Sequence, residues 1–219
     1  MMKYVFFIIM IIILIIFLLV SLNNFSFGKG NINSKEKYSF LNQFPFELCD
    51  ESKSSAPLFT KVLAALFGAS FSIFGAYTFF SLNMYNAKIM QDYVMGALLL
   101  ITGIVIFLLF VWDLKDYVKH LIVTSILFVI TAINYIYFGL FVLMDPRELF
   151  HPALIYICFT IGILIVLCLL ILPFKNWMYL EKDDKDGIIK YHRQKVSLLP
   201  LSEWIGILLN LIFAIIIVI

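Results

Sequence analysis

Three side chains suited to acid–base chemistry lie just before hydrophobic segments of this 219-residue sequence. Asp116 and His120 are four residues apart, so a continuous helix places them on one face. Glu203 precedes another hydrophobic segment. A carboxylate beside an imidazole can exchange protons with a substrate or bind a lipid headgroup. Asp116, His120 and Glu203 are therefore the candidate catalytic residues if the protein is an enzyme, whereas solvation at a membrane surface is the simpler interpretation.

Other polar and aromatic residues are predicted at the same membrane surface. Trp204 follows Glu203, and indole rings are typical of the boundary between a bilayer and water. We predict that His120 contacts Glu203 directly or through a first-loop group such as Asp50. The predicted polar cluster comprises Glu47, Asp50, Asp116, His120, Glu203 and Trp204.

The sequence has no pattern typical of a bound cofactor, metal ion or nucleic acid. His151 is predicted on the opposite surface from His120, and no HxxxH or CxxC spacing occurs. A phosphate-binding glycine loop and a GxSxG motif are also absent. The net charge is +2 and is not concentrated in one basic stretch. We therefore expect no cofactor, no metal and no nucleic-acid partner.

The composition is that of a membrane protein. Hydrophobic residues make up 63% and charged residues 14% of the chain, against about 45–50% and about 25% in soluble domains. Too little polar surface is available to cover the apolar side chains in water, which excludes a soluble enzyme. Because roughly 20 mostly apolar residues cross a bilayer, the sequence predicts one all-α transmembrane domain over 1–219, a six-helix bundle. The six predicted spans are 4–22, 59–82, 93–112, 121–144, 153–173 and 200–219.

An even number of spans puts both termini on one side of the membrane. The long segments 23–58 and 174–203 then lie together on the other side. Basic residues have a similar density on the two sides, so the positive-inside rule does not orient the chain. A cleaved signal peptide is the alternative to the first span, but the apolar run is long and no small-residue cleavage site follows Val20. Cys49, in the first long segment, is a predicted labelling site for a membrane-impermeant thiol reagent.

Small and amide side chains inside the predicted spans indicate how the helices pack. In the second span, small residues recur every four positions, which lets another backbone approach closely. Asn134 and Asn210 need hydrogen-bond partners in lipid, so we predict that they face the bundle interior, and a substrate path is the alternative role. No predicted span carries a charged residue at its centre, which argues against an ion-coupled transporter. The predicted packing residues are Ala64, Gly68, Ser72, Ala76, Asn134 and Asn210.

Short motifs precede three of the predicted spans. Residues 44–50 read FPFELCD and residues 54–59 read SSAPLF at the entry to the second span. His120 lies at the start of the fourth span, and Glu203 and Trp204 lie at the start of the sixth. These motifs and the six-span layout resemble the DRAM/Frag/Sfk family of eukaryotic membrane proteins, which includes the damage-regulated autophagy modulators.

The resemblance implies cytosolic termini and a luminal or extracellular first loop. It also implies an endomembrane, either lysosome or Golgi, or the plasma membrane, with roles in autophagy, in lysosomes or in membrane lipid organisation. The expected partners are the bilayer, lipid headgroups and other membrane proteins. The first functional hypothesis is a non-enzymatic multi-pass membrane protein. The second is a lipid-modifying enzyme or a GPI-anchor remodelling factor that uses the His/carboxylate cluster, and a small transporter is the third.

Overall fold

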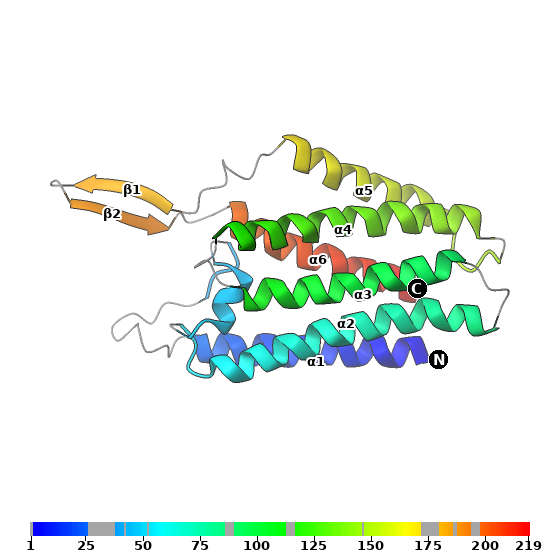
Figure 1. Ribbon diagram of the computed structural model, residues 1–219, viewed down its shortest axis with the longest axis horizontal. Coiled ribbons are helices and arrows are strands. Elements are labelled where there is room, and N and C mark those ends of the chain that lie inside the picture. Colours follow the sequence, from blue (N-terminus) through cyan, green and yellow to red (C-terminus); the bar gives the residue numbers. More distant parts are fainter. Residues whose placement is uncertain are drawn as a thin grey trace.

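Six long helices make up most of the protein. The computed structural model describes residues 2–25, 38–41, 43–51, 53–85, 90–112, 117–145, 147–171, 180–185, 188–193 and 198–219. The helices are α1 (Met2–Phe25), α2 (Pro57–Tyr85), α3 (Met90–Val111), α4 (Tyr117–Met144), α5 (Ala153–Ile171) and α6 (Leu198–Val218). All six contain a segment long and apolar enough to cross a membrane, and they run side by side along the long axis of the molecule (Figure 1). The predicted all-α, six-helix transmembrane architecture is therefore confirmed, and the chain is a multi-pass membrane protein.

Several helices begin before the hydrophobic segment that predicts them. α2 begins at Pro57, where a missing N–H costs nothing because the first helical turn has no internal acceptor. α3 begins at Met90 and so includes Asp92 in its first turn. α4 begins at Tyr117, which puts His120 inside the helix. A hydrophobic segment indicates only the part of a helix that lies in lipid. Backbone hydrogen bonds extend the same helix beyond that part into the polar interface.

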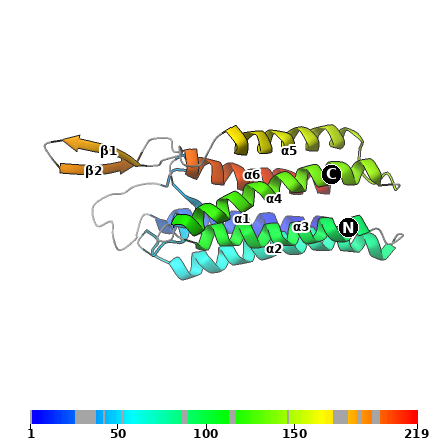
Figure 2. The same cartoon turned by 45° about the horizontal axis from the view of Figure 1, so that its top comes forward.

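Two short elements lie outside the six helices. The 3₁₀ helix η1 (Pro45–Cys49) lies between α1 and α2. An antiparallel hairpin between α5 and α6 pairs β1 (Leu180–Lys185) with β2 (Ile188–Arg193), in a register that runs from Leu180 opposite Arg193 to Lys185 opposite Ile188. The hairpin extends beyond the end of the helical bundle (Figure 2). The sequence analysis had treated this segment only as part of a long loop.

The two chain ends lie together at the end of the bundle opposite η1 and the hairpin. Figure 1 shows both termini at one end, and the Lys3 Nζ donates a hydrogen bond to the Ile217 carbonyl at 3.4 Å. The end that carries η1 therefore corresponds to one membrane surface, and the end that carries the termini corresponds to the other.

The stripe of small residues on α2 lies partly against α3. Ala64 and Gly68 are buried and Ala76 is half-buried. A Cβ placed on Gly68 would lie 2.7 Å from the Gly103 carbonyl oxygen, so the two backbones are nearly in contact there. The Ser72 hydroxyl donates to a backbone carbonyl of α3 at 2.9 Å. Small residues thus allow a hydrogen bond between neighbouring helices, as expected where no water can separate them.

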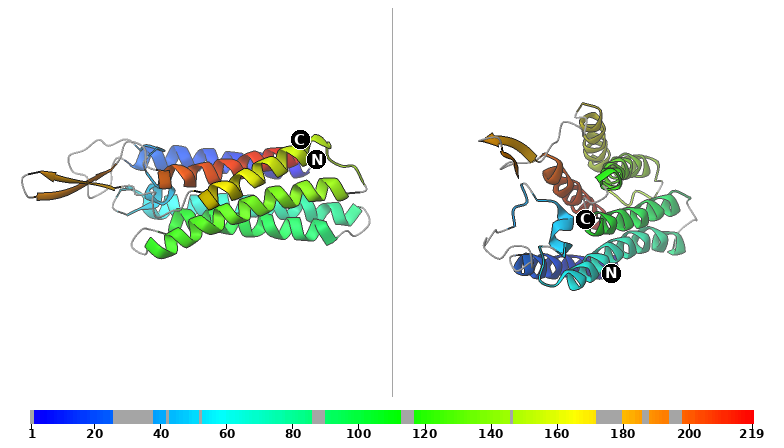
Figure 3. Two further views of the ribbon diagram at one scale, coloured as in Figure 1. Left: turned by 90° about the horizontal axis from the view of Figure 1, so that it is seen from above. Right: turned by 60° about the vertical axis from the view of Figure 1, so that its left-hand side comes forward.

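α5 lies at the periphery of the bundle. Figure 3 shows it beside α4 at the edge, and it is the least buried of the six spans, followed by α1. α4 is instead flanked by α3, α5 and α6. The functional side chains described below project from the α4 faces that meet α3 and α6.

Candidate functional site

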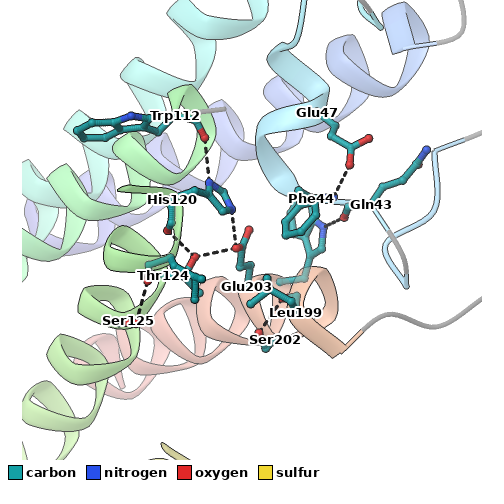
Figure 4. Close-up of polar contacts among 12 residues, drawn as sticks. Gln43, Phe44, Glu47, Trp112, His120, Thr124, Ser125, Leu199, Ser202 and Glu203 are labelled. Carbon is teal, nitrogen blue, oxygen red and sulfur yellow. Dashed lines mark hydrogen bonds and ion pairs between the residues drawn. The ribbon is translucent and has the colours of Figure 1, made fainter. Parts of the chain in front are cut away.

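His120 and Glu203 form a buried pair between α4 and α6. Both side chains are fully buried, and the His120 Nε2 lies 2.8 Å from the Glu203 Oε1 (Figure 4). Thr124 is one turn after His120 on the same helix face, and its Oγ1 lies 2.7 Å from the same carboxyl oxygen. The predicted contact between His120 and Glu203 is therefore present and direct, and Thr124 joins it.

The backbone of Trp112 determines which ring nitrogen of His120 carries a proton. The His120 Nδ1 lies 3.0 Å from the Trp112 carbonyl oxygen. A carbonyl can only accept a hydrogen bond, so Nδ1 must be the donor. The contact between Nε2 and the Glu203 Oε1 then needs one proton, which either atom can hold. In both arrangements the pair has no net charge, because it is either two neutral groups or one cation and one anion.

The second carboxyl oxygen of Glu203 has no hydrogen-bond partner in the described part of the chain. Glu203 Oε2 is buried, as is the whole side chain. Leaving a buried polar atom without a partner costs about 1–3 kcal/mol. This oxygen is therefore the one polar atom of the pair that can still accept a hydrogen bond from another group.

Two phenylalanines of the first loop pack on the histidine of the pair. The rings of Phe44 and Phe46 lie edge-on to the His120 ring, with centroids 5.3 and 5.2 Å away, and both side chains are buried. Phe44 is extended because it precedes Pro45. Its N–H donates to the Glu47 Oε1 at 3.2 Å, which caps the start of η1. The local sequence thus fixes η1 in the geometry that places both rings on the histidine.

The neighbour of Glu203 on α6 holds the same loop. The Trp204 indole N–H lies 3.1 Å from both the Tyr38 hydroxyl and the Gln43 carbonyl, and the Tyr38 hydroxyl donates to the Phe44 carbonyl at 2.9 Å. Burial, followed by the negative charge of Glu47, raises the pKa of Tyr38 well above its ordinary value, so the hydroxyl keeps its proton. Two consecutive residues of α6 therefore help to hold the first loop. Glu203 binds His120, on which the loop phenylalanines pack, and Trp204 donates hydrogen bonds to the loop directly.

The other members of the predicted cluster have different roles. Glu47 is buried, caps η1 and forms an ion pair with Lys53. Asp50 is half-buried at the end of η1, where its carbonyl accepts the Ser54 N–H at 2.8 Å. Asp116 lies outside the described residues. The direct contact between the histidine and the glutamate needs no bridge through Asp50.

Cys49 is not a suitable site for thiol labelling, contrary to the prediction from its loop position. It is the last residue of η1 and its side chain is 1% exposed. Burial raises the pKa of the thiol to about 12, so little reactive thiolate is present at neutral pH. Position in a long loop does not imply exposure here, because η1 packs against the end of the bundle.

The two predicted asparagines face the bundle interior. The Asn134 amide N–H donates to the Thr102 hydroxyl of α3 at 2.8 Å, and that of Asn210 donates to the Thr131 hydroxyl of α4 at 2.8 Å. Both side chains are fully buried. Their carbonyl oxygens, Asn134 Oδ1 and Asn210 Oδ1, have no hydrogen-bond partner among the described residues.

A second buried charged cluster lies at the opposite end of the bundle. Arg147 binds Asp92 through two parallel hydrogen bonds of 3.0 and 2.8 Å, and its Nε donates to the Asp145 Oδ1 at 2.7 Å. Hydrogen bonds to Asp92 and Asp145 raise the pKa of Arg147 above its ordinary value. This cluster is not among the residues predicted from the sequence. The signal that could have indicated it is an aspartate in the first turn of one helix together with an arginine in a short loop on the same side of the membrane.

The residues that the structure describes at the η1 end include groups suited to acid–base chemistry. No group of three or more His, Cys, Asp or Glu side chains within the described residues could hold a metal ion. The buried pair can shift a proton between an imidazole and a carboxyl group. Comparison with protein-family models, curated proteins and solved structures finds no match, so the interpretation of the site depends on its geometry.

Proposed function

We propose that this protein is a non-enzymatic endomembrane protein, similar to the autophagy and lysosome modulators of the DRAM/Frag/Sfk family or to regulators of membrane lipid organisation. The observation that carries the proposal is that both ring nitrogens of His120 are occupied, one by a backbone carbonyl and the other by Glu203. The partners are the lipid bilayer, its headgroups and other membrane proteins. The compartment is the lysosome or Golgi, or the plasma membrane.

The geometry of the pair supports a structural role better than a catalytic one. A general base must approach the proton that it removes to about 2.6–3.2 Å. The His120 Nε2 faces Glu203, and the rings of Phe44 and Phe46 pack on the imidazole, so a substrate would have to displace these rings to reach Nε2. The same contacts join α4, α6 and the first loop. Removing one partner of such a buried pair costs about 3–5 kcal/mol, because the other partner stays buried and uncompensated.

A lipid-modifying enzyme is the second candidate, and one observation favours it. The buried Oε2 of Glu203 has no partner among the described residues, and a catalytic role is one explanation for a buried group that is left unsatisfied. If η1 moved aside, His120 and Glu203 could exchange a proton with a lipid or a GPI anchor. Asp116, four residues before His120 in the sequence, would be the third residue of that site.

Two substitutions separate the candidates. His120→Ala removes the contact, whereas Glu203→Gln keeps a hydrogen bond to the His120 Nε2 but cannot exchange a proton. The measurements are thermal stability, delivery of a tagged protein to its compartment, and lipid composition by mass spectrometry. His151→Ala is the matched control, because His151 is exposed and lies in the segment between α4 and α5, which joins the end of α4 farthest from His120.

If the protein is non-enzymatic, we expect His120→Ala to be less stable and to be delivered poorly to its compartment. We expect Glu203→Gln to keep wild-type stability, delivery and lipid composition. If the protein is an enzyme, we expect Glu203→Gln to fold and to be delivered normally, while the abundance of its lipid substrate rises. The second outcome would reject the proposal.

A further inference from the structure

Two hydrogen bonds that each join a threonine of α4 to a polar side chain of α6 recur along the interface of these helices, with the threonine as donor in the first and as acceptor in the second. In the first, the Thr124 hydroxyl lies 2.7 Å from the Glu203 Oε1. In the second, seven residues further along both helices, the Thr131 hydroxyl lies 2.8 Å from the Asn210 amide nitrogen. Each contact leaves one buried oxygen of the α6 residue without a partner, namely Glu203 Oε2 and Asn210 Oδ1. Both oxygens are acceptors, so the missing partner in each case is a hydrogen-bond donor.

The two unpaired oxygens differ in their depth in the membrane. Glu203 lies in the second turn of α6, next to Trp204, and indole rings favour the headgroup level of a bilayer. Asn210 lies seven residues further along, which is about 10 Å deeper into the hydrocarbon. Only the Glu203 oxygen is therefore at a depth that the headgroup of a lipid or a solute from the aqueous side can reach.

The charges around Glu203 favour an uncharged donor. The pair of His120 and Glu203 has no net charge, because its single shared proton neutralises it. Glu47 forms an ion pair with Lys53. A bound ammonium or phosphate would therefore bring a charge that the described groups around this oxygen do not compensate, and burying such a charge is costly. A hydroxyl donor satisfies the oxygen without that cost.

We infer that Glu203 Oε2 accepts a hydrogen bond from an uncharged hydroxyl group, supplied by a lipid headgroup or by a soluble polyol, that enters beneath η1. Phe44 and Phe46 are the side chains that the ligand displaces, because their rings pack on His120, the partner of Glu203. The inference deepens the proposed function and depends on it in taking lipids as partners, since it names the headgroup chemistry that the protein recognises.

The test uses the full-length protein in nanodiscs of phosphatidylcholine, whose headgroup has no N–H or O–H donor. The first probe is monoglucosyl diacylglycerol at increasing mole fraction in the disc, and the second is methyl glucoside in the buffer. The readout is the unfolding temperature, which rises when a ligand binds only the folded state. We expect a saturable rise with the glucosyl lipid. A rise with methyl glucoside as well would assign the site to soluble polyols.

Variants locate the site. Glu203→Leu removes the acceptor and should weaken binding about tenfold, the effect of one lost hydrogen bond. Glu203→Gln keeps a carbonyl oxygen and should bind as the wild type does. Asn210→Leu is the matched control, because it removes the same kind of unpaired oxygen at a greater depth, and its probe response should be unchanged.

If Glu203→Leu fails to fold, Phe46→Ala tests the inference instead. This variant removes one of the two rings that the ligand displaces, so it should bind the probe at least as tightly as the wild type. Weaker binding would contradict entry beneath η1. A wild-type protein that responds to neither probe would show that water alone fills the site and would overturn the inference. An equal loss in Glu203→Leu and Asn210→Leu would do the same. None of these outcomes alters the stability and delivery results for His120→Ala, so the proposed function is tested separately.

Discussion

Gly103→Ala tests the close packing of α2 against α3. A Cβ at Gly103 would overlap the Gly68 carbonyl oxygen and the Ser72 hydroxyl, and it would lie 2.8 Å from the Ser72 backbone nitrogen. Two of these three atoms belong to the α2 backbone, so a side-chain rotation cannot relieve the overlap. The helices would have to separate, and the hydrogen bond from Ser72 to α3 would lengthen.

Two opposing terms set the size of the effect. Alanine is favoured over glycine in a helix by about 1 kcal/mol. Overpacking of a well-packed interface costs about 1–3 kcal/mol, and a clash with backbone atoms belongs at the upper end. The expected net loss is therefore about 1–2 kcal/mol. For a chain of this length it corresponds to an unfolding temperature lower by about 2–8 °C.

Gly139→Ala is the matched control on α4. The nearest atoms to a Cβ there are the Cε2 and Cδ2 of Phe159, at 3.2 and 3.3 Å, and a ring can move by the few tenths of an ångström that are needed. The helix term then dominates, and the stability should stay the same or rise. Thermal unfolding of both variants in the same nanodiscs measures the difference. A Gly103→Ala protein as stable as the wild type, or an equal loss in Gly139→Ala, would refute the reasoning.

Three further predictions follow from other parts of the structure. Arg147→Ala should lower stability by about 3–5 kcal/mol in thermal unfolding, because it leaves buried Asp92 without its counter-charge. Arg147→Lys keeps the charge but cannot form the two parallel hydrogen bonds to Asp92, so it should lower stability by about 1.5–3 kcal/mol; a lysine variant of wild-type stability would contradict this. Cys49 should resist a membrane-impermeant thiol reagent until the protein unfolds. A cysteine introduced by Glu51→Cys, where the native side chain is 79% exposed, should react in sealed vesicles from the luminal side only. Reaction from the cytosolic side alone would reverse the predicted orientation. The pKa of Tyr38 is raised in the folded state, so the stability that its protonated hydroxyl contributes is complete below the unfolded pKa of about 10 and is lost as the pH rises above that value. Between pH 8 and pH 11, the unfolding temperature of Tyr38→Phe should therefore fall less than that of the wild type. An equal fall in both proteins would count against the buried hydroxyl.

The sequence predicts the membrane architecture and the polar pair, for two separate reasons. The six spans follow from hydrophobic length alone, which depends on local composition. His120 and Glu203 both lie at the start of a span, and parity puts both starts on one surface. The 2.8 Å contact between them also requires that α4 and α6 are neighbours, which no local pattern specifies. Thr124 could have been identified, because it is one turn from His120 on the same face.

The charged cluster at the opposite end of the bundle does not follow from any sequence motif. Asp92 and Arg147 are not identified from the sequence as partners, yet the Arg147 side chain forms a bidentate pair with the buried Asp92 carboxylate. Their sequence separation of 55 residues conceals the contact, whereas parity places both at the same surface. The hairpin was missed because β1 reads LEKDDK, which has no hydrophobic alternation. Its strand structure depends on pairing with β2, which a local pattern in β1 alone does not indicate.

Hydrogen–deuterium exchange of the first loop tests the structural role of the buried pair most directly. The reporters are the amides of Asp50 and Ser54, which donate to Glu47 and Asp50 carbonyls, with the α2–α3 amides as an internal reference. His120→Ala removes the contact with Glu203 and the imidazole ring on which Phe44 and Phe46 pack, so exchange of these loop amides should become about tenfold faster or more. Exchange of the reference amides, and exchange of the loop amides in His151→Ala, should stay as in the wild type. Unchanged exchange in the first loop of a folded His120→Ala protein would contradict the account.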